Sequence, residues 1–148
     1  MKTILIFFLL GLIFSYDGTS AATYAQKYCN NYNPNYNKYE SKTAENINFI
    51  SQCISIGGGQ DFEGCEGRDD KGMFTKGSDL KNCLISKGWK KTETIKKGNA
   101  AFKKIRDGAV IVSNDFTFLG NFHLSSHGPK RCSASMFHKF VEFYEPPN

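Results

Sequence analysis

The fold is decided by residues 46–59, which read NINFISQCISIGGG. Four apolar side chains in this stretch recur every three or four residues, which predicts one apolar stripe on a helix packed against a core. Thr43 is the expected N-cap, and Glu45 falls in the first turn, where a negative charge is favourable. The glycines at 57–59 are expected to end the helix, because glycine readily adopts the left-handed conformation of a helix C-terminus. The four apolar residues are Phe49, Ile50, Cys53 and Ile54.

Outward from this helix, the sequence predicts helices first and strands afterwards. Helical apolar spacing also occurs over residues 22–31 and 78–88, the latter with Ser78 as its expected N-cap. The Asn- and Tyr-rich stretch 30–39 and the Gly-rich stretch 60–77 are predicted loops. Helices followed by β-branched and aromatic strands indicate the α+β class with an antiparallel sheet. The predicted strands cover residues 109–112, 116–124 and 140–144.

The N-terminus has the three regions of a secretory signal peptide. Lys2 is followed by an apolar run of eleven residues, 4–14, which is shorter than the roughly 20 residues of a membrane-spanning helix. Small residues follow, and cleavage is expected after Ser20 or Ala21. We therefore expect a signal peptide over residues 1–21, a secreted single domain over 22–148 and no membrane span. A buried N-terminal helix is the alternative reading of the run.

The charge and the size of the chain exclude several function classes. A net charge of +5 arises from scattered lysines without a basic repeat, so a nucleic-acid partner is not expected. A domain of this size can bury a core without a cofactor, and none is predicted. His127 and His138 with Cys132 match no strong metal-binding spacing, so no metal site is predicted.

Five cysteines in an exported chain predict disulfide bonds. An odd number leaves at least one thiol unpaired or joined to another chain. Connectivity cannot be read from a sequence, but Cys65 with Cys83 is the preferred pair, because it would tie the Gly-rich loop to the next helix. Cys53 lies on the apolar stripe and is expected in the core.

Several short motifs together resemble the putative amidase domain family, a branch of the papain-like, NlpC/P60-type cysteine hydrolases. The resemblance implies a papain-like fold in which N-terminal helices pack on a small antiparallel sheet. It covers most of the chain after the signal peptide and is most specific in the central helix. The motifs that carry it are Tyr24-Ala25, Asn33-Pro34-Asn35-Tyr36, residues 48–53, Gly57-Gly58, residues 80–88 and residues 95–99.

Laid on the family pattern, the catalytic positions of this chain are degenerate. The nucleophilic cysteine of the family falls on Asn46, and the general-base histidine falls on Gly108. An amide nitrogen is not nucleophilic, and glycine cannot accept a proton. General base catalysis alone contributes about 10²–10⁴-fold, so losing both groups should abolish the mechanism. His123 is a candidate remnant of the third polar group.

Two function classes follow from this comparison. The first is a catalytically inactive binding module for peptide or cell-wall-type glycopeptide ligands. The second is an active cysteine amidase, with His123 or His127 as base and Cys132 or Cys29 as nucleophile. A secreted effector acting on a protein partner is a third class that leaves no mark in the sequence. The expected groove of the binding module is lined by Tyr32, Tyr36, Tyr39, Asn46 and His123, unless the tyrosines pack over the edge of the core.

Overall fold

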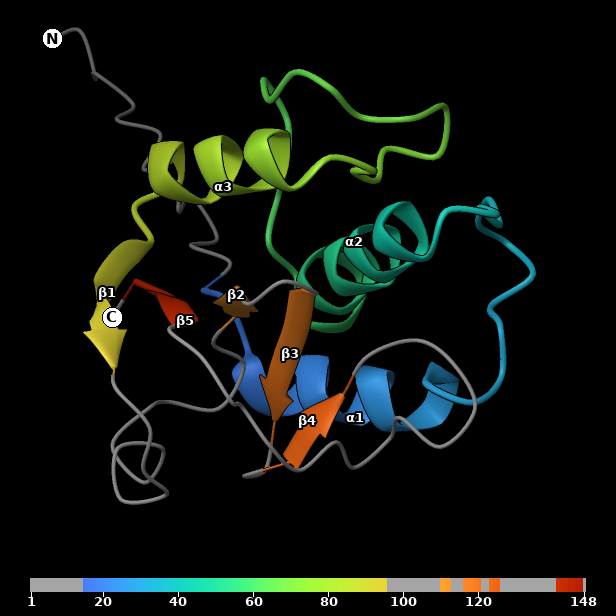
Figure 1. Ribbon diagram of the computed structural model, residues 1–148, viewed down its shortest axis with the longest axis horizontal. Helices are drawn as coiled ribbons and strands as arrows, with labels where there is room; N and C mark the ends of the chain where they lie inside the picture. Colours follow the sequence, from blue (N-terminus) through green and yellow to red (C-terminus); the bar gives the residue numbers. More distant parts are fainter. Residues whose placement is uncertain (1–14, 96–109, 113–115, 121–122, 126–140, 148) are drawn as a thin grey trace, which may run out of the picture.

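The computed structural model describes residues 15–95, 110–112, 116–120, 123–125 and 141–147. Helices come first along this part of the chain and strands follow, as the sequence predicts (Figure 1). The described residues are mostly helical. The helices are α1 (Gly18–Tyr28), α2 (Lys42–Gln52), the π-helix η1 (Cys53–Gly57) and α3 (Gly77–Ser86). The strands are β1 (Lys90–Ile95), β2 (Val110–Val112), β3 (Phe116–Gly120), β4 (His123–Ser125) and β5 (Val141–Glu145).

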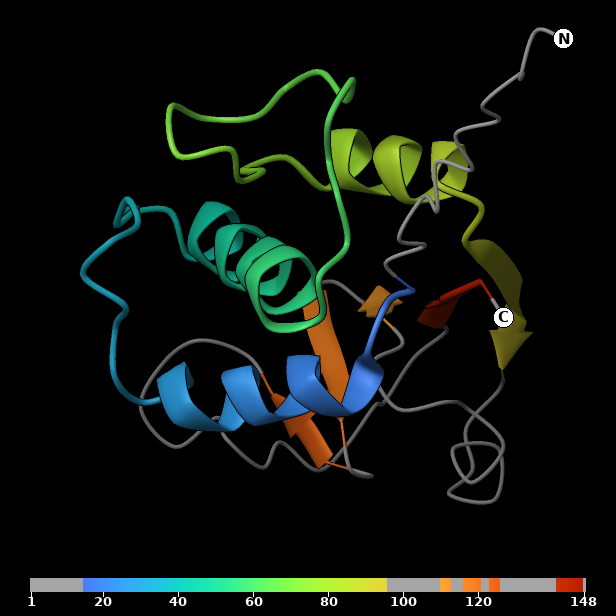
Figure 2. The same cartoon turned by 180° about the vertical axis from the view of Figure 1, so that it is seen from behind.

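The strands form one antiparallel sheet in the order β1-β5-β2-β3-β4. In the register of the first pair, Lys90 lies opposite Glu145 and Lys91 opposite Tyr144. The prediction of one strand over 116–124 is wrong, because β3 and β4 pair with each other and Leu119 lies opposite Leu124. Even spacing of apolar residues does not distinguish one long strand from a hairpin. Helices α1 and α2 both contact β3, which lies next to both helices in Figures 1 and 2.

The helix starts differ from the predicted ones, and for α1 and α2 side chains earlier in the sequence provide the caps. Helix α1 begins at Gly18 rather than residue 22, with Asp17 as its N-cap. Helix α2 is capped by Ser41, whose Oγ accepts from the amide of Ala44 at 3.4 Å, rather than by Thr43. Helix α3 begins at Gly77 without a side-chain cap, so the assignment of Ser78 as its cap is wrong.

The glycines after α2 serve close packing more than helix termination. The helix continues past Gln52 as η1, and only Gly59, with a φ of 76°, has the left-handed conformation. A Cβ on Gly57 would lie 2.6 Å from Cβ of Tyr24, and one on Gly58 would lie 2.2 Å from Cε2 of Tyr16. Both distances are too short for real atoms, so these two glycines let α1 and the residues before it approach η1.

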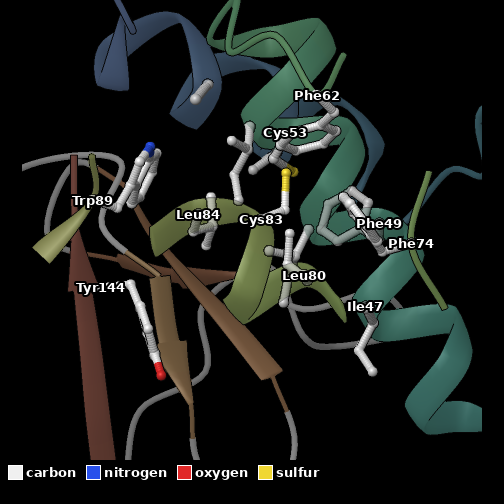
Figure 3. Packing of buried hydrophobic residues seen from close by; sticks show 14 of the residues in the cluster. Ile47, Phe49, Cys53, Phe62, Phe74, Leu80, Cys83, Leu84, Trp89 and Tyr144 are labelled. Atoms are coloured by element: carbon white, nitrogen blue, oxygen red, sulfur yellow. The ribbon is translucent and has the colours of Figure 1, made fainter. Parts of the chain in front are cut away.

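The core lies between the helices and continues to the sheet through Trp89 and Tyr144 (Figure 3). The apolar stripe predicted on the central helix is buried, as expected. The Phe62 and Phe74 rings, from the loop between η1 and α3, meet edge to face with centroids 5.1 Å apart. This loop is therefore part of the core. The buried stripe consists of Phe49, Ile50, Cys53 and Ile54.

The cysteines confirm the preferred pairing. Cys65 and Cys83 form a disulfide bond with their Cα atoms 5.5 Å apart, which ties the Gly-rich loop to α3. Cys29 is disulfide-bonded as well, and Cys53 is the free thiol among the described cysteines. Within the described ranges, no helix combines the length and the apolar character needed to cross a membrane.

Candidate functional site

A chain of hydrogen-bonded polar side chains runs along the inner side of α2. The Asn33 amide donates to the Tyr24 hydroxyl at 2.8 Å, and this hydroxyl donates to Oε1 of Gln52 at 2.9 Å. Nε2 of Gln52 donates to Oδ1 of Asn48 at 2.8 Å, and Nδ2 of Asn48 donates to Oδ2 of Asp69 at 3.0 Å. We call these five residues the amide network. It joins α1, the Asn-Pro loop, α2 and the Gly-rich loop.

The loop segment around Asp69 is shaped so that its carboxylate receives several donors. The backbone amide of Asp69 donates to the carbonyl of Met73 at 2.7 Å, and that of Gly72 donates to the carbonyl of Asp69 at 3.0 Å. Gly72 has a φ of 79°, which favours glycine at this turn. Within the turn, Oδ1 of Asp69 accepts from the amides of Lys71 at 3.0 Å and Met73 at 2.9 Å.

Oδ2 of Asp69 accepts from three side chains, two in the loop before α2 and one in α2 itself. The Tyr39 hydroxyl donates to it at 2.7 Å, the Asn48 amide at 3.0 Å and the Asn37 amide at 3.3 Å. Partial burial acts to raise the pKa of Asp69, but the hydrogen bonds from Met73, Tyr39 and their neighbours outweigh it and lower the pKa. Asp69 therefore remains ionised at neutral pH and holds the loop against the start of α2.

The tyrosines of the predicted groove do not form one cluster. Tyr32 and Tyr39 lie near Asp69, and burial raises the pKa of Tyr32 to about 12. Tyr36 lies on the other side, near Tyr28. The Tyr32 hydroxyl donates to the carbonyl of Tyr36 at 2.8 Å, and all three rings are half-buried. The hydroxyls of Tyr32 and Tyr39 are therefore hydrogen-bonded within the protein, while part of each side chain stays exposed.

Asn46, the fourth predicted groove residue, lies in α2 and is 1% exposed. Among the residues that the structure describes, neither its amide nitrogen nor its carbonyl oxygen has a hydrogen-bond partner. A buried polar group without a partner costs about 1–3 kcal/mol, so nothing in the local packing explains an asparagine here. The preceding Glu45 accepts from the amide of Tyr39 at 2.7 Å through Oε2, which places the Tyr39 backbone beside the same turn.

The other predicted site residues divide into two groups. His123 is the first residue of β4, where it lies opposite Gly120 in the register. Gly108, His127, Cys132 and His138 lie outside the described residues. Within the part of the chain that the structure describes, no group of three histidine, cysteine or acidic side chains could hold a metal ion.

Comparison with known sequences identifies the family. The sequence model of the putative amidase domain matches residues 15–124. The chain belongs to the putative amidase domain family. No curated protein and no solved structure matches the chain significantly. The family match starts at residue 15, ahead of the domain start at residue 22 that the sequence predicts.

The residues that carry the resemblance to the putative amidase domain have structural roles here. Asn33 and Tyr24 lie at one end of the amide network, and Asn48 and Gln52 lie in its middle. Gly57 and Gly58 form the close contacts with Tyr24 and Tyr16. The family motif therefore specifies how α1, α2 and the loops fit together, and it does not by itself indicate an active site.

None of the described thiols in this putative amidase domain is an accessible nucleophile. Cys29, Cys65 and Cys83 are disulfide-bonded. Cys53 is free but completely buried, and burial raises the pKa of its thiol well above the ordinary value. The suggestion that Cys29 could act as nucleophile is therefore wrong for the disulfide-bonded protein, because its sulfur is not a thiol.

Sequence reasoning missed Asp69, the acceptor of the network. Its segment, residues 68–72, contains adjacent acidic and basic residues before a glycine, which indicates a turn but not a partner on a distant helix. The early start of α1 was also missed. Its signal was available, since Asp17 stands directly before a run with helical spacing, as an N-cap does.

Proposed function

We propose that this chain is a secreted, catalytically inactive member of the amidase family that binds peptide or cell-wall-type glycopeptide ligands on a papain-like scaffold. The observation that carries the proposal is Asn46, which stands where the resemblance places the nucleophile. Its side chain cannot attack an amide bond, and it is buried.

The chemistry of cysteine hydrolases explains why this matters. They need a thiolate close to an imidazole, with the sulfur near a helix N-terminus where its pKa is lowered. Cys53 is seven residues after Asn46, about 10 Å further along the helix at ~1.5 Å per residue. Its raised pKa opposes thiolate formation. A papain-like mechanism therefore has no described sulfur at the start of α2.

The tyrosines near the start of α2 support a binding role. Tyr32 and Tyr39, the two on the Asp69 side, are half-buried, and their hydroxyls are held by the carbonyl of Tyr36 and by Asp69. Fixed aromatic rings offer contact area at low conformational cost, and they suit sugar rings and peptide side chains. Asp69 and Glu45 add negative charge beside Tyr32, which favours ligands with a donor group or a positive charge.

A catalytic assay and a thiol-labelling experiment test the inactive assignment together. We expect no turnover of peptide amides or muropeptide fragments, and no alkylation of Cys53 in the native state with or without substrate, because its thiol is completely buried. Turnover that disappears when a thiol is alkylated, with the label mapped to Cys132, would instead establish the active cysteine amidase.

A titration with glycopeptide fragments tests the binding assignment. We expect saturable binding, and Tyr32→Ala should weaken it about tenfold if one ring stacks on the ligand. Tyr28→Ala is the matched control, since Tyr28 is a half-buried tyrosine on α1 outside the proposed groove. Equal effects of both variants, or the absence of saturation, would contradict the proposed groove.

A further inference from the structure

The residues just before α1 are integral to the folded domain. The Tyr16 ring packs against Trp89 with centroids 4.9 Å apart, and Trp89 is itself buried. Gly58 has no side chain at the place where a Cβ would lie 2.2 Å from the Tyr16 ring. Burial raises the pKa of Tyr16 well above its ordinary value. Tyr16 therefore fills a space that the glycine motif leaves open.

Asp17 fixes the start of α1. Its Oδ1 accepts from the amides of Thr19 at 3.0 Å and Ser20 at 3.1 Å, and its Oδ2 accepts from the Ser20 hydroxyl at 2.7 Å. Its own amide donates to the carbonyl of Gly58 at 2.9 Å. Ala21, the residue after Ser20, is completely buried. The chain from Tyr16 to Ala21 is thus bound to the domain through packing, capping and backbone contacts.

A cut after Ser20 or Ala21 would remove these contacts. It would delete Tyr16, the cap Asp17 and the first turn of α1, and it would leave the Tyr16 side of Gly58 and Trp89 uncovered. Of the bonds that a signal peptidase could use, only those before Tyr16 leave the domain intact. Ser15 is the one small residue between the apolar run and Tyr16, and it supplies the small residue directly before the bond that an A-x-A-like cleavage site has, with Ile13 at the other position of that pattern.

We propose that the Ser15–Tyr16 peptide bond is the processing site and that the mature chain begins at Tyr16. A signal peptidase hydrolyses the bond with one water molecule. The hydroxyl of the water forms the carboxylate of Ser15, and the proton passes to the amine of Tyr16. Ser15 is exposed, and the family match begins at Ser15, one residue before the proposed mature N-terminus, so it includes Tyr16 and Asp17. The inference does not depend on the binding function.

The test is the N-terminus of the full-length chain secreted from a eukaryotic or bacterial host. Intact mass and N-terminal sequencing should both give a chain starting at Tyr16. A start at Ala21 or Ala22, or an uncleaved chain, would overturn the proposal. Ser15→Leu should prevent cleavage at this bond, whereas the matched control Ser20→Leu should leave the start at Tyr16. A start that responds to Ser20→Leu and not to Ser15→Leu would refute the site.

A second measurement tests the structural reason. Chains starting at Tyr16 and at Ala22 are released from a fusion partner and compared by thermal unfolding. The shorter chain should melt roughly 10 °C lower, since it loses the partly buried Tyr16 side chain, which packs against the core, and the helix cap. Equal melting temperatures would show that Tyr16 and Asp17 do not stabilise the domain, and would contradict a cut before them.

Discussion

Removing the carboxylate of Asp69 should destabilise the protein by about 3 kcal/mol. In Asp69→Ala, every donor that converges on this side chain loses its acceptor. The loop between η1 and α3 then has no polar attachment to α2 through the amide network. Asp70→Ala is the matched control, because Asp70 is an exposed carboxylate in the same turn whose described partner is Asn37.

The size of this loss in stability depends on which of the donors can be hydrated by water once the carboxylate is removed. Tyr39 is half-buried and Lys71 is exposed, so water replaces much of what these two donors lose, whereas Met73 is buried. Asn48 is 1% exposed, and its Nδ2 would become a buried donor without a partner, at a cost of about 1–3 kcal/mol. Hydrogen bonds to a charged acceptor contribute about 1.5–3 kcal/mol each, but bonds that share one acceptor are not additive. The expected loss in the free energy of unfolding is therefore about 3 kcal/mol, close to the cost at Asn48 alone.

Urea unfolding at neutral pH measures this difference. Asp69→Ala should lower the free energy of unfolding by about 3 kcal/mol and the melting temperature by roughly 10 °C, whereas Asp70→Ala should change the free energy by less than about 0.5 kcal/mol. If the two variants are equally stable, Asp69 does not hold the loop and the amide network has no stabilising role at its acceptor.

The same variant has a signature in the pH dependence of stability. The folded-state pKa of Asp69 is lowered, so the ionised carboxylate stabilises the fold at every pH above its unfolded pKa of about 3.9. This stabilisation is lost as the pH falls through the folded-state value. Wild type should therefore lose stability more steeply than Asp69→Ala below about pH 4, and parallel acid-unfolding curves would contradict the assignment.

Three further substitutions test other contacts. Gly58→Ala should cost about 2 kcal/mol in urea unfolding because its Cβ would strike the Tyr16 ring, and less in a Tyr16→Ala background; equal costs would exclude the clash. Tyr24→Phe should cost about 2 kcal/mol, since the two buried amides that its hydroxyl joins lose a partner, and a neutral result would show that they find another. Replacing both Cys65 and Cys83 by serine should lower the free energy of unfolding by about 3 kcal/mol, as expected for a loop closed over 18 residues. Reductant should then cause no further loss through this bond, because the double variant lacks it.

The central helix and the helix-before-strand order could be predicted from the sequence because both depend on local spacing. The stripe from Phe49 to Ile54 is set by the period of the helix alone. The pairing of Cys65 with Cys83 was preferred because it ties the Gly-rich loop to the next helix, and the structure confirms it, although connectivity itself cannot be read from a sequence. The hairpin of β3 and β4 was not, because apolar residues at even spacing look the same in one strand and in two.

The contacts of the candidate site depend on residues that are far apart in the chain. The bond from Asn48 to Asp69 joins residues 21 positions apart, and nothing local to either one indicates the other. Gly58 looks like a helix terminator in the sequence, and only the position of Tyr16 reveals its packing role. Asn46 is the reverse case. The resemblance assigns it to the nucleophile position, which stays a prediction, and only the structure reveals that it is buried without a partner among the described residues.

The disulfide bond between Cys65 and Cys83 also determines whether cleavage of the loop by a protease separates the chain into two fragments. The chain between these residues includes exposed positions such as Glu66, Arg68 and Lys71, where a protease could cut. A nick there would leave both fragments covalently joined, and the buried Phe74 would still anchor the segment in the core. The nicked protein would migrate as one species without reductant and as two with it, so limited digestion of this loop need not release either half.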